Sequence, residues 1–231
     1  MQDLPQHVAI IPDGNRRWAR QHGLPLIEGH RIGIDKLRHV LEWCRKLDIR
    51  MVTLWGFSME NFDRDKNEVQ LLMKLFEQKI GEINRDEVEE NKIRVRIFGR
   101  KELLTPKVRE SIEKFEKDTE KYSNYFVNIL LAYGGRQEIV DACNSILQDC
   151  RNGKLKEITE ETFPKYLSTG ELPDPDLVIR TSGEQRLSGL MPWKSAYSEL
   201  YFCPKLWPDF SEQDLKDAVE EYKKRKRRFG R

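Results

Sequence analysis

Apolar and polar stretches alternate along the chain in a pattern that predicts strands taking turns with helices. Short apolar runs typical of buried strands lie at residues 7–11, 51–57, 94–98, 125–133, 177–179 and 200–202. Segments with helical periodicity or helix-start signals lie between and after them, at 16–20, 30–47, 68–91, from 105, at 137–150, at 159–167 and from 211. This alternation predicts one α/β domain over residues 1–231, with a mostly parallel central sheet flanked by helices.

Composition fits one such domain and argues against a nucleic-acid partner. The 231 residues suffice for one large domain, and 41 basic residues nearly balance 39 acidic ones, for a net charge of +2. Six basic residues run together at 223–228, and no aromatic stacking platform accompanies them. We therefore expect that the protein does not bind nucleic acid.

Cysteine usage and hydropathy favour a cytoplasmic protein. The four cysteines form no CxxC pair and no zinc-type spacing, so we expect reduced thiols. No apolar run approaches the roughly 20 residues that a membrane span needs. Polar residues and a proline at 3–7 interrupt any signal-peptide core near the beginning of the chain.

The stretch at 176–202 carries residues suited to a cluster of anionic oxygens. An apolar run ends at Arg180, and Arg186 and Ser188 follow it. Arginine supplies planar, permanently charged donors and serine adds a hydroxyl, so this strand end predicts a phosphate site. Glu199 stands before the next apolar run and is a candidate magnesium ligand, because Mg²⁺ usually takes one or two carboxylates plus phosphate oxygens. The alternative is a surface network of salt bridges.

A second candidate anion site follows the first apolar run. The turn after it contains Asp13 and Gly14, and Arg16 and Arg17 begin a helical segment. Helix N-terminal N–H groups, a glycine and two arginines all favour phosphate oxygens. Phosphate would repel Asp13 unless a cation lay between them, which points to magnesium here. The alternative is an ordinary Asp-Gly turn in which Asp13 caps the helix.

Polar side chains also follow the run at 51–57. Ser58, Glu60, Asn61 and Arg64 stand there, and His30 near the start of a long amphipathic segment could meet the same ligand. Parallel strands point their carboxyl ends to one edge of the sheet, so we expect these groups and the two described above to converge on one crevice.

The predicted helix at 68–91 has an apolar face wider than a surface helix needs. The residues of this face are Val69, Leu72, Met73, Leu75, Phe76 and Ile80. Ordinary core packing is one interpretation. The other is that this face forms the wall of an apolar tunnel.

These residues fall in long, ordered motifs that resemble the cis-prenyltransferases, the family of undecaprenyl and dehydrodolichyl diphosphate synthases. The similarity covers nearly the whole chain and is carried by HVAIIPDGNRRWA (7–19), GHRIG (29–33), TLWGFSMENFDR (53–64), DLVIRTSGEQRLSGLMPWKSAYSELYF (176–202) and LWPDF (206–210). The resemblance implies a Mg²⁺-dependent transferase that adds isopentenyl diphosphate to geranyl, farnesyl or geranylgeranyl diphosphate. The product would be a Z-polyprenyl diphosphate such as undecaprenyl diphosphate, a precursor of glycosyl carrier lipid, and an apolar tunnel would hold the growing chain.

The resemblance also implies roles for individual residues. Asp13 would be essential beside magnesium and diphosphate, Asn61 would serve in proton removal, and Glu199 would be a second magnesium ligand. The allylic diphosphate would contact Gly14, Asn15, Arg16, Arg17, Trp18 and His30. A mobile loop closing over the substrate would contain Ser58, Met59, Glu60, Phe62 and Arg64. Isopentenyl diphosphate would contact Arg180, Arg186, Leu187 and Ser188.

The end of the chain resembles the RxG tail of the family. This tail lies in the basic segment 223–231 and would reach across a dimer interface, so Arg228 and Gly230 are expected to bind substrate in the partner's site. The resemblance thus implies a homodimer. Its apolar product would be released to the membrane, which is compatible with a cytoplasmic enzyme at the membrane periphery.

Two departures from the family pattern leave other activities open. Leu26 stands where the family usually has an arginine, and SGLMPW at 188–193, which contains Gly189, replaces the common SNFLLW or SDFLLW. One alternative is therefore an irregular coupling of two allylic diphosphates on the same fold. The other is a non-catalytic partner subunit, against which the intact Asp13, Asn61 and Glu199 argue.

Overall fold

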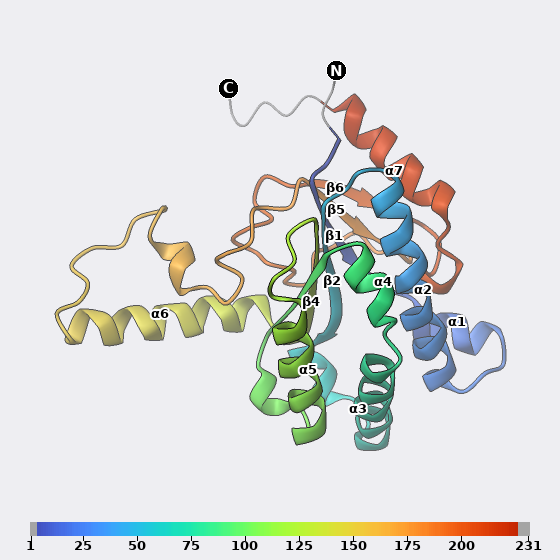
Figure 1. Ribbon diagram of the computed structural model, residues 1–231, viewed down its shortest axis with the longest axis horizontal. Coiled ribbons are helices and arrows are strands. Elements are labelled where there is room, and N and C mark those ends of the chain that lie inside the picture. The colour runs from blue at the N-terminus through green and yellow to red at the C-terminus, as the bar shows by residue number, and fades with distance from the viewer. Residues whose placement is uncertain (1–3, 226–231) are drawn as a thin grey trace.

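Six parallel strands form the centre of the fold (Figure 1). The computed structural model describes residues 4–225, and its strands are β1 (His7–Ile11), β2 (Met51–Ser58), β3 (Ile93–Phe98), β4 (Tyr125–Tyr133), β5 (Leu177–Arg180) and β6 (Glu199–Phe202). Their order is β3-β4-β2-β1-β5-β6, and each neighbouring pair is parallel. The predicted α/β fold is confirmed, and the sheet is wholly parallel over the described residues.

Helices connect these strands. The α-helices within residues 4–225 are α1 (Asn15–Gln21), α2 (Leu26–Lys46), α3 (Lys66–Gly81), α4 (Arg85–Glu90), α5 (Pro106–Thr119), α6 (Gly135–Arg151) and α7 (Glu212–Lys224). Short 3₁₀ turns lie at η1 (Met59–Asp63), η2 (Lys101–Leu103), η3 (Phe163–Tyr166) and η4 (Trp207–Asp209). Within this part of the chain, no helix combines the length and apolar character that crossing a membrane requires.

The prediction of one continuous helix at 68–91 is wrong, because the structure divides this segment into α3 and α4. Asn84 begins α4 by accepting hydrogen bonds from the backbone N–H groups of Asp86 and Glu87 at 3.2 and 3.3 Å. Such a cap satisfies N–H groups that a continuous helix would bond to its preceding turn. The helix predicted at 159–167 is likewise reduced to η3, which has a proline in its first turn.

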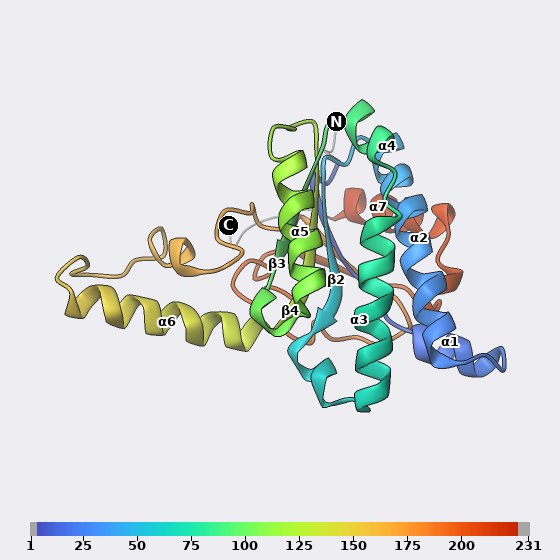
Figure 2. The same ribbon diagram turned by 60° about the horizontal axis from the view of Figure 1, so that its bottom comes forward.

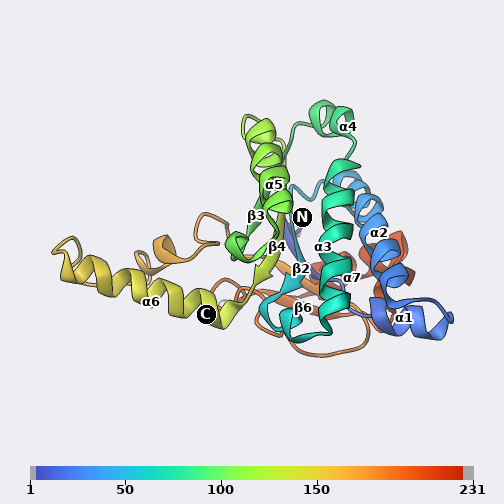
Figure 3. The same ribbon diagram turned by 90° about the horizontal axis from the view of Figure 1, so that it is seen from below.

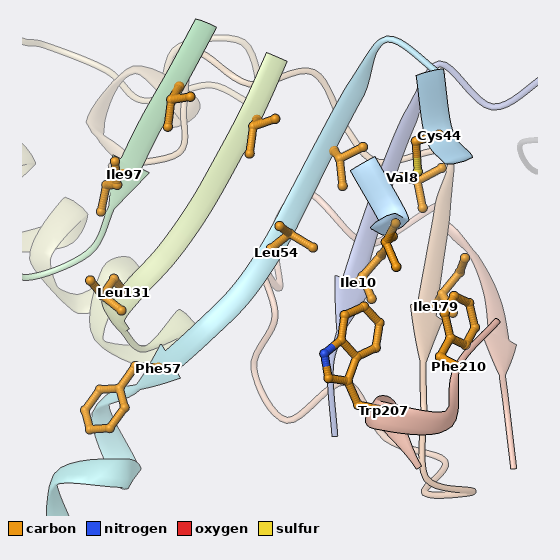
Figure 4. Packing of buried hydrophobic residues seen from close by; sticks show 14 of the residues in the cluster. Val8, Ile10, Cys44, Leu54, Phe57, Ile97, Leu131, Ile179, Trp207 and Phe210 are labelled. Carbon is orange, nitrogen blue, oxygen red and sulfur yellow. The ribbon is translucent and has the colours of Figure 1, made fainter. Parts of the chain in front are cut away.

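The two faces of the sheet bury different sets of side chains. On β1, Val8 and Ile10 belong to the larger cluster, which includes residues of α2, α3, α5 and α7, whereas Ala9 and Ile11 belong to a second cluster. This alternation follows from the two-residue repeat of a strand. Figure 4 shows part of the larger cluster, with Trp207 beside Ile10 at one end of the sheet.

Helix α6 departs from this layered arrangement. It projects away from the sheet together with the segment that follows it (Figures 1 and 2). Val140 and Leu147 on this helix are about half exposed, at 51% and 54%. The projecting helix therefore offers apolar side chains outside the body of the domain.

Candidate active site

The loop after β1 brings a carboxylate to the carboxyl edge of the sheet. Tertiary hydrogen bonds fix the backbone of Asp13, because its carbonyl oxygen accepts from the Thr181 hydroxyl at 2.7 Å and from the Trp207 N–H at 3.0 Å. The next residue, Gly14, has φ +113°, and a Cβ there would lie 2.9 Å from the Leu206 side chain. Only glycine meets both requirements without strain, so the Asp-Gly pair sets where α1 begins.

Arg180 joins the ends of β1 and β5. It is 4% exposed, and its guanidinium donates to the Arg186 carbonyl oxygen at 2.7 Å, to Ser188 Oγ at 2.8 Å and to Asp13 Oδ2 at 2.7 Å. These bonds use the rigid fork of the guanidinium and hold it in one orientation. The structure thereby brings together Asp13, Arg180, Arg186 and Ser188, as the sequence predicted for neighbouring strand ends.

Two carboxylates that the sequence did not point to, Glu184 and Glu68, form ion pairs with the other arginines of the site. Glu184 pairs with Arg17 at 3.3 Å and also with Arg186. Glu68 places Oε1 3.4 Å from Arg16 Nε and 3.4 Å from Arg64 Nη1. Helical spacing does not explain the contact with Arg64, because Arg64 has an extended backbone and precedes α3.

Three buried nitrogen atoms at this edge make no hydrogen bond to another described residue, although Glu68 Oε1 lies 3.4 Å from Arg16 Nε and 3.8 Å from His30 Nε2. Arg16 Nε, His30 Nε2 and Arg180 Nε are buried and have no hydrogen-bond partner among the described residues. All three residues line the same cavity. Buried donors are normally satisfied, so an anionic ligand such as a diphosphate fits this arrangement.

Burial and neighbouring cations lower the pKa of His30. Its pKa falls from 6.5 to about 4, first through desolvation and then through the guanidiniums of Arg64 and Arg16. The unfolded chain therefore binds more protons than the folded one between these two pH values. Stability is consequently lost as pH falls from about 6.5 towards about 4. We expect His30→Gln to weaken this pH dependence, measured as urea unfolding free energies at pH 7, 6, 5 and 4.5.

The matched control is His22→Gln, at an exposed histidine after α1. It should keep the pH dependence of the wild type. Equal slopes for wild type and His30→Gln would contradict the lowered pKa of His30.

The predicted mobile loop forms η1, and only part of it faces the cavity. Ser58, Asn61 and Arg64 line the cavity, and Asn61 Oδ1 accepts a hydrogen bond from the Ser58 backbone N–H at 3.2 Å. Glu60 is exposed, and Phe62 packs edge-on against the Phe57 ring, with centroids 4.9 Å apart. The structure thus divides this predicted group into residues that line the cavity, the exposed Glu60, and Phe62, which packs against the core.

Some other predicted contacts also lie away from the cavity lining. The Trp18 indole N–H donates to Asp209 Oδ1 at 2.8 Å, and its ring stacks on His22. Met59 packs near Gly134, and Leu187 contacts the second cluster. The remaining predicted residues of the first loop, Gly14, Asn15, Arg16 and Arg17, do line the cavity.

A cavity of about 1200 Å³ extends inward from this polar edge. Its mouth is lined by Asp13 and the cations described above, and its interior runs between α2, α3, α5 and the sheet. Apolar side chains make up much of the interior, including Leu37, Leu41, Leu72, Phe76, Ile80, Ile93, Val95, Ile112, Phe115 and Val127. Of the predicted apolar face, Leu72, Phe76 and Ile80 line this cavity, as the tunnel interpretation expects. The other three residues, Val69, Met73 and Leu75, do not line it.

Glu199 does not join Asp13 within one chain. It is the first residue of β6 and lies beside Leu177, whereas Asp13 follows the opposite end of β1. Its carboxylate pairs with Arg225 at 2.9 Å. The expectation that Glu199 lies at the same strand end as Arg180 is therefore corrected: in a parallel sheet, the start of β6 is remote from the carboxyl edge. Arg228 and Gly230 lie outside the described residues.

The mouth fits magnesium only in combination with a substrate. Residues 4–225 contain no group of three or more His, Cys, Asp or Glu side chains arranged to hold a metal ion. Asp13, with 30% of its side chain exposed, supplies one carboxylate among cations that attract a diphosphate. One carboxylate plus phosphate oxygens is a common magnesium environment, so the residues present fit the ion.

A cation-lined mouth above a long apolar cavity, in a parallel α/β sheet, defines an enzyme for substrates with an anionic head and a long apolar tail. The family model described as "Putative undecaprenyl diphosphate synthase" matches residues 11–230. The chain belongs to this family, the cis-prenyltransferases, which confirms the resemblance seen in the motifs. Its relatives are named as prenyl-transferring enzymes.

Two curated relatives match over most of their length. The "tritrans,polycis-undecaprenyl-diphosphate synthase (geranylgeranyl-diphosphate specific)" of Pyrococcus horikoshii is 52% identical over 231 residues, covering 99% of this chain and 88% of the relative. The "isoprenyl transferase" of Thermotoga maritima is 50% identical over 227 residues, covering 98% and 97%. Among solved structures, lavandulyl diphosphate synthase from Lavandula x intermedia in complex with dimethylallyl diphosphate has a TM-score of 0.95 at 37% identity, covering 99% of both chains.

Proposed function

We propose that this prenyltransferase adds isopentenyl diphosphate repeatedly to an allylic diphosphate, with geranylgeranyl diphosphate as the preferred starter, and makes a long Z-polyprenyl diphosphate. The cavity of about 1200 Å³ carries this proposal, because it connects the diphosphate-binding edge with an extended apolar interior. The starter is inferred from the name of the Pyrococcus horikoshii relative. Undecaprenyl diphosphate, named for the same relative, is the proposed product.

The two diphosphates bind at neighbouring parts of the mouth. In this proposal Arg16, Arg17 and His30 hold the allylic diphosphate at the start of α1 and α2. Arg180, Arg186 and Ser188 hold isopentenyl diphosphate at the end of β5. The allylic C1 and the C4 carbon of isopentenyl diphosphate are then held close together, which supplies much of the rate acceleration.

The reaction joins these two carbons. The C1–O bond of the allylic substrate breaks, and diphosphate leaves with the electron pair while the C4=C3 double bond attacks C1. Arginines facing the leaving group stabilise its growing charge. Loss of a proton from C2 then forms the new Z double bond. The Asn61 amide is a poor base, so we assign it relay of this proton.

Magnesium is proposed to bind at Asp13 together with diphosphate oxygens. When bound, it supplies positive charge that helps diphosphate depart. If Glu199 also serves this ion, as the family resemblance implies, it must come from a second copy of the chain, since within one chain it lies at the other edge of the sheet.

A homodimer follows from the same reasoning. The projecting α6 exposes Val140 and Leu147, and burial of such side chains favours association. Arg228 and Gly230 of the tail are proposed to reach the partner's mouth. We expect Arg228→Ala to lower kcat while light scattering still shows a dimer. A wild-type protein that is fully active as a monomer would contradict this arrangement.

Irregular coupling of two allylic diphosphates remains the second candidate. The structure of lavandulyl diphosphate synthase, to which this chain is similar, contains an allylic diphosphate, and Leu26 begins α2 where the family pattern has an arginine. The long cavity argues for elongation, because coupling of two short chains needs no such depth.

The test is a reaction of purified protein with Mg²⁺, labelled isopentenyl diphosphate and each starter in turn. Chromatography of the dephosphorylated products should show a ladder ending at one long chain, and chelation of the metal should abolish it. Product from allylic substrate alone, without isopentenyl incorporation, would establish irregular coupling instead. If neither reaction gives a product, the interpretation as a non-catalytic partner subunit is favoured.

A further inference from the structure

A largely buried glutamate at the start of α3 gathers side chains from three other segments. Glu68 stands in the first turn of this helix, and only 11% of its side chain is exposed. Its Oε1 atom lies 3.4 Å from Arg16 of α1, 3.8 Å from His30 of α2 and 3.4 Å from Arg64, which follows η1. One carboxylate oxygen therefore links α1, α2 and the end of η1 to α3.

Glu68 approaches these side chains from outside the cavity. Arg16, His30 and Arg64 line the cavity, whereas Glu68 does not. With a pKa of about 4, His30 is neutral at pH 7, so the two guanidiniums carry the positive charge of this cluster. Guanidiniums at such short range repel each other unless an anion lies between them. Glu68 supplies that anion and leaves both arginines at the cavity wall.

The same glutamate joins the polar mouth to the apolar wall. Glu68, Leu72 and Phe76 are spaced four residues apart on α3 and so lie along one face of the helix. Leu72 and Phe76 line the cavity interior. Helix α3 runs beside α2 (Figures 2 and 3), and further along it Lys79 lies 2.6 Å from Asp35 of α2. Ion pairs near both ends of α3 thus hold this wall against α1 and α2.

Two effects of the Glu68 charge on a bound diphosphate oppose each other. A carboxylate repels the diphosphate, but Arg16 and Arg64 reach the cavity and Glu68 does not. Without the carboxylate, Arg16 can turn towards solvent, because 38% of its side chain is already exposed. A guanidinium that turns away loses its charge-assisted hydrogen bonds to phosphate oxygens. Loss of orientation therefore outweighs relief of repulsion.

We propose that Glu68 is a positioning residue that directs Arg16 and Arg64 at the allylic diphosphate and couples the binding of this head group to the α3 wall that holds the tail. This inference rests on the proposed function, in which the allylic diphosphate binds at Arg16, Arg17 and His30. In the same proposal isopentenyl diphosphate binds at the end of β5. Glu68 therefore acts selectively on one of the two substrates.

The first test is the steady-state kinetics of Glu68→Gln with Mg²⁺ and both substrates. The substitution keeps the size of the side chain and one acceptor oxygen, and it removes the charge. The KM for geranylgeranyl diphosphate should rise by on the order of tenfold, because charge-assisted hydrogen bonds are lost, while the KM for isopentenyl diphosphate stays within about twofold. An equal rise in both KM values, or no rise in either, would overturn the proposed role.

The matched control is Glu77→Gln on the same helix. Glu77 lies 3.6 Å from Lys107 of α5 and does not line the cavity. Both KM values of this variant should equal those of wild type. In a protein that already carries Arg16→Gln and Arg64→Gln, Glu68→Gln should add little further loss, since residues that act through one another are not additive. Fully additive losses would contradict action through these arginines.

Binding of geranylgeranyl diphosphate without isopentenyl diphosphate gives a second measurement. Calorimetry should show a Kd about tenfold higher for Glu68→Gln than for wild type or Glu77→Gln. Amide hydrogen exchange across residues 66–76 should slow when the ligand binds to wild type, and slow less in Glu68→Gln. Tighter binding to Glu68→Gln, or equal slowing in both proteins, would overturn this inference alone. A wild-type protein that incorporates no isopentenyl diphosphate would instead overturn the proposed function.

Discussion

Asp13→Asn is expected to lower kcat by on the order of 10²-fold or more, as removal of a charge that organises a reacting site typically does. The change keeps the shape of the side chain and removes its negative charge. Arg180 then loses its carboxylate partner at 2.7 Å, and the site loses the one carboxylate proposed to face magnesium. Steady-state turnover at saturating isopentenyl diphosphate and starter measures the effect, with magnesium titrated over a wide range.

The control for this variant is Asp48→Asn. Asp48 lies at the other edge of the sheet, between α2 and β2, and its φ of +54° is a conformation that asparagine also tolerates. Its turnover should match wild type. Near-normal turnover of Asp13→Asn at ordinary magnesium concentration would remove Asp13 from the proposed machinery.

Arg180→Met is expected to lower kcat/KM for isopentenyl diphosphate by at least about 10²-fold. The reason is that this one buried guanidinium donates hydrogen bonds to three acceptors at the mouth. Arg180→Lys should recover little of this loss, since an ammonium cannot reproduce the planar fork that spans Asp13 and Ser188. The kinetic measurement is a comparison of KM values: the KM for isopentenyl diphosphate should rise more than the KM for the allylic substrate.

Thermal unfolding separates this functional loss from a folding defect. The comparison protein is Arg50→Met, at an arginine that is 65% exposed near the start of β2. It should resemble wild type in both stability and kinetics. If Arg180→Lys has wild-type kinetics, the bidentate role of Arg180 is wrong.

Much of the fold could be predicted because its signals are local. Each strand appears as a short apolar run, and the structure places the predicted strands within a residue of their expected ends. The convergence of Asp13 and Arg180 also followed from sequence, because parallel strands share a carboxyl edge and both residues follow strands. The same argument would have placed Glu199 at the opposite edge, because it stands before the apolar run of β6 and not after it.

Glu68 and Glu184 show a different limit. Each lies close to residues that the motifs identified, yet a carboxylate near a predicted phosphate site looks unfavourable when read alone. The structure shows that each glutamate pairs with two arginines. Their role depends on several side chains that come together in the folded protein. A rule for the spacing of one pair of residues along the chain cannot predict such a group.

The sequence by itself determined the strand and helix pattern, the family and the cations of the mouth, because each depends on residues that are near neighbours or fall in an ordered motif. Only the tertiary structure decided the depth of the cavity, the separation of α4 from α3, and the edge of the sheet on which Glu199 lies. The depth of the cavity depends on the volumes of side chains from distant elements that pack together. The break between α3 and α4 depends on local capping, and the position of Glu199 depends on the direction of β6 in the sheet.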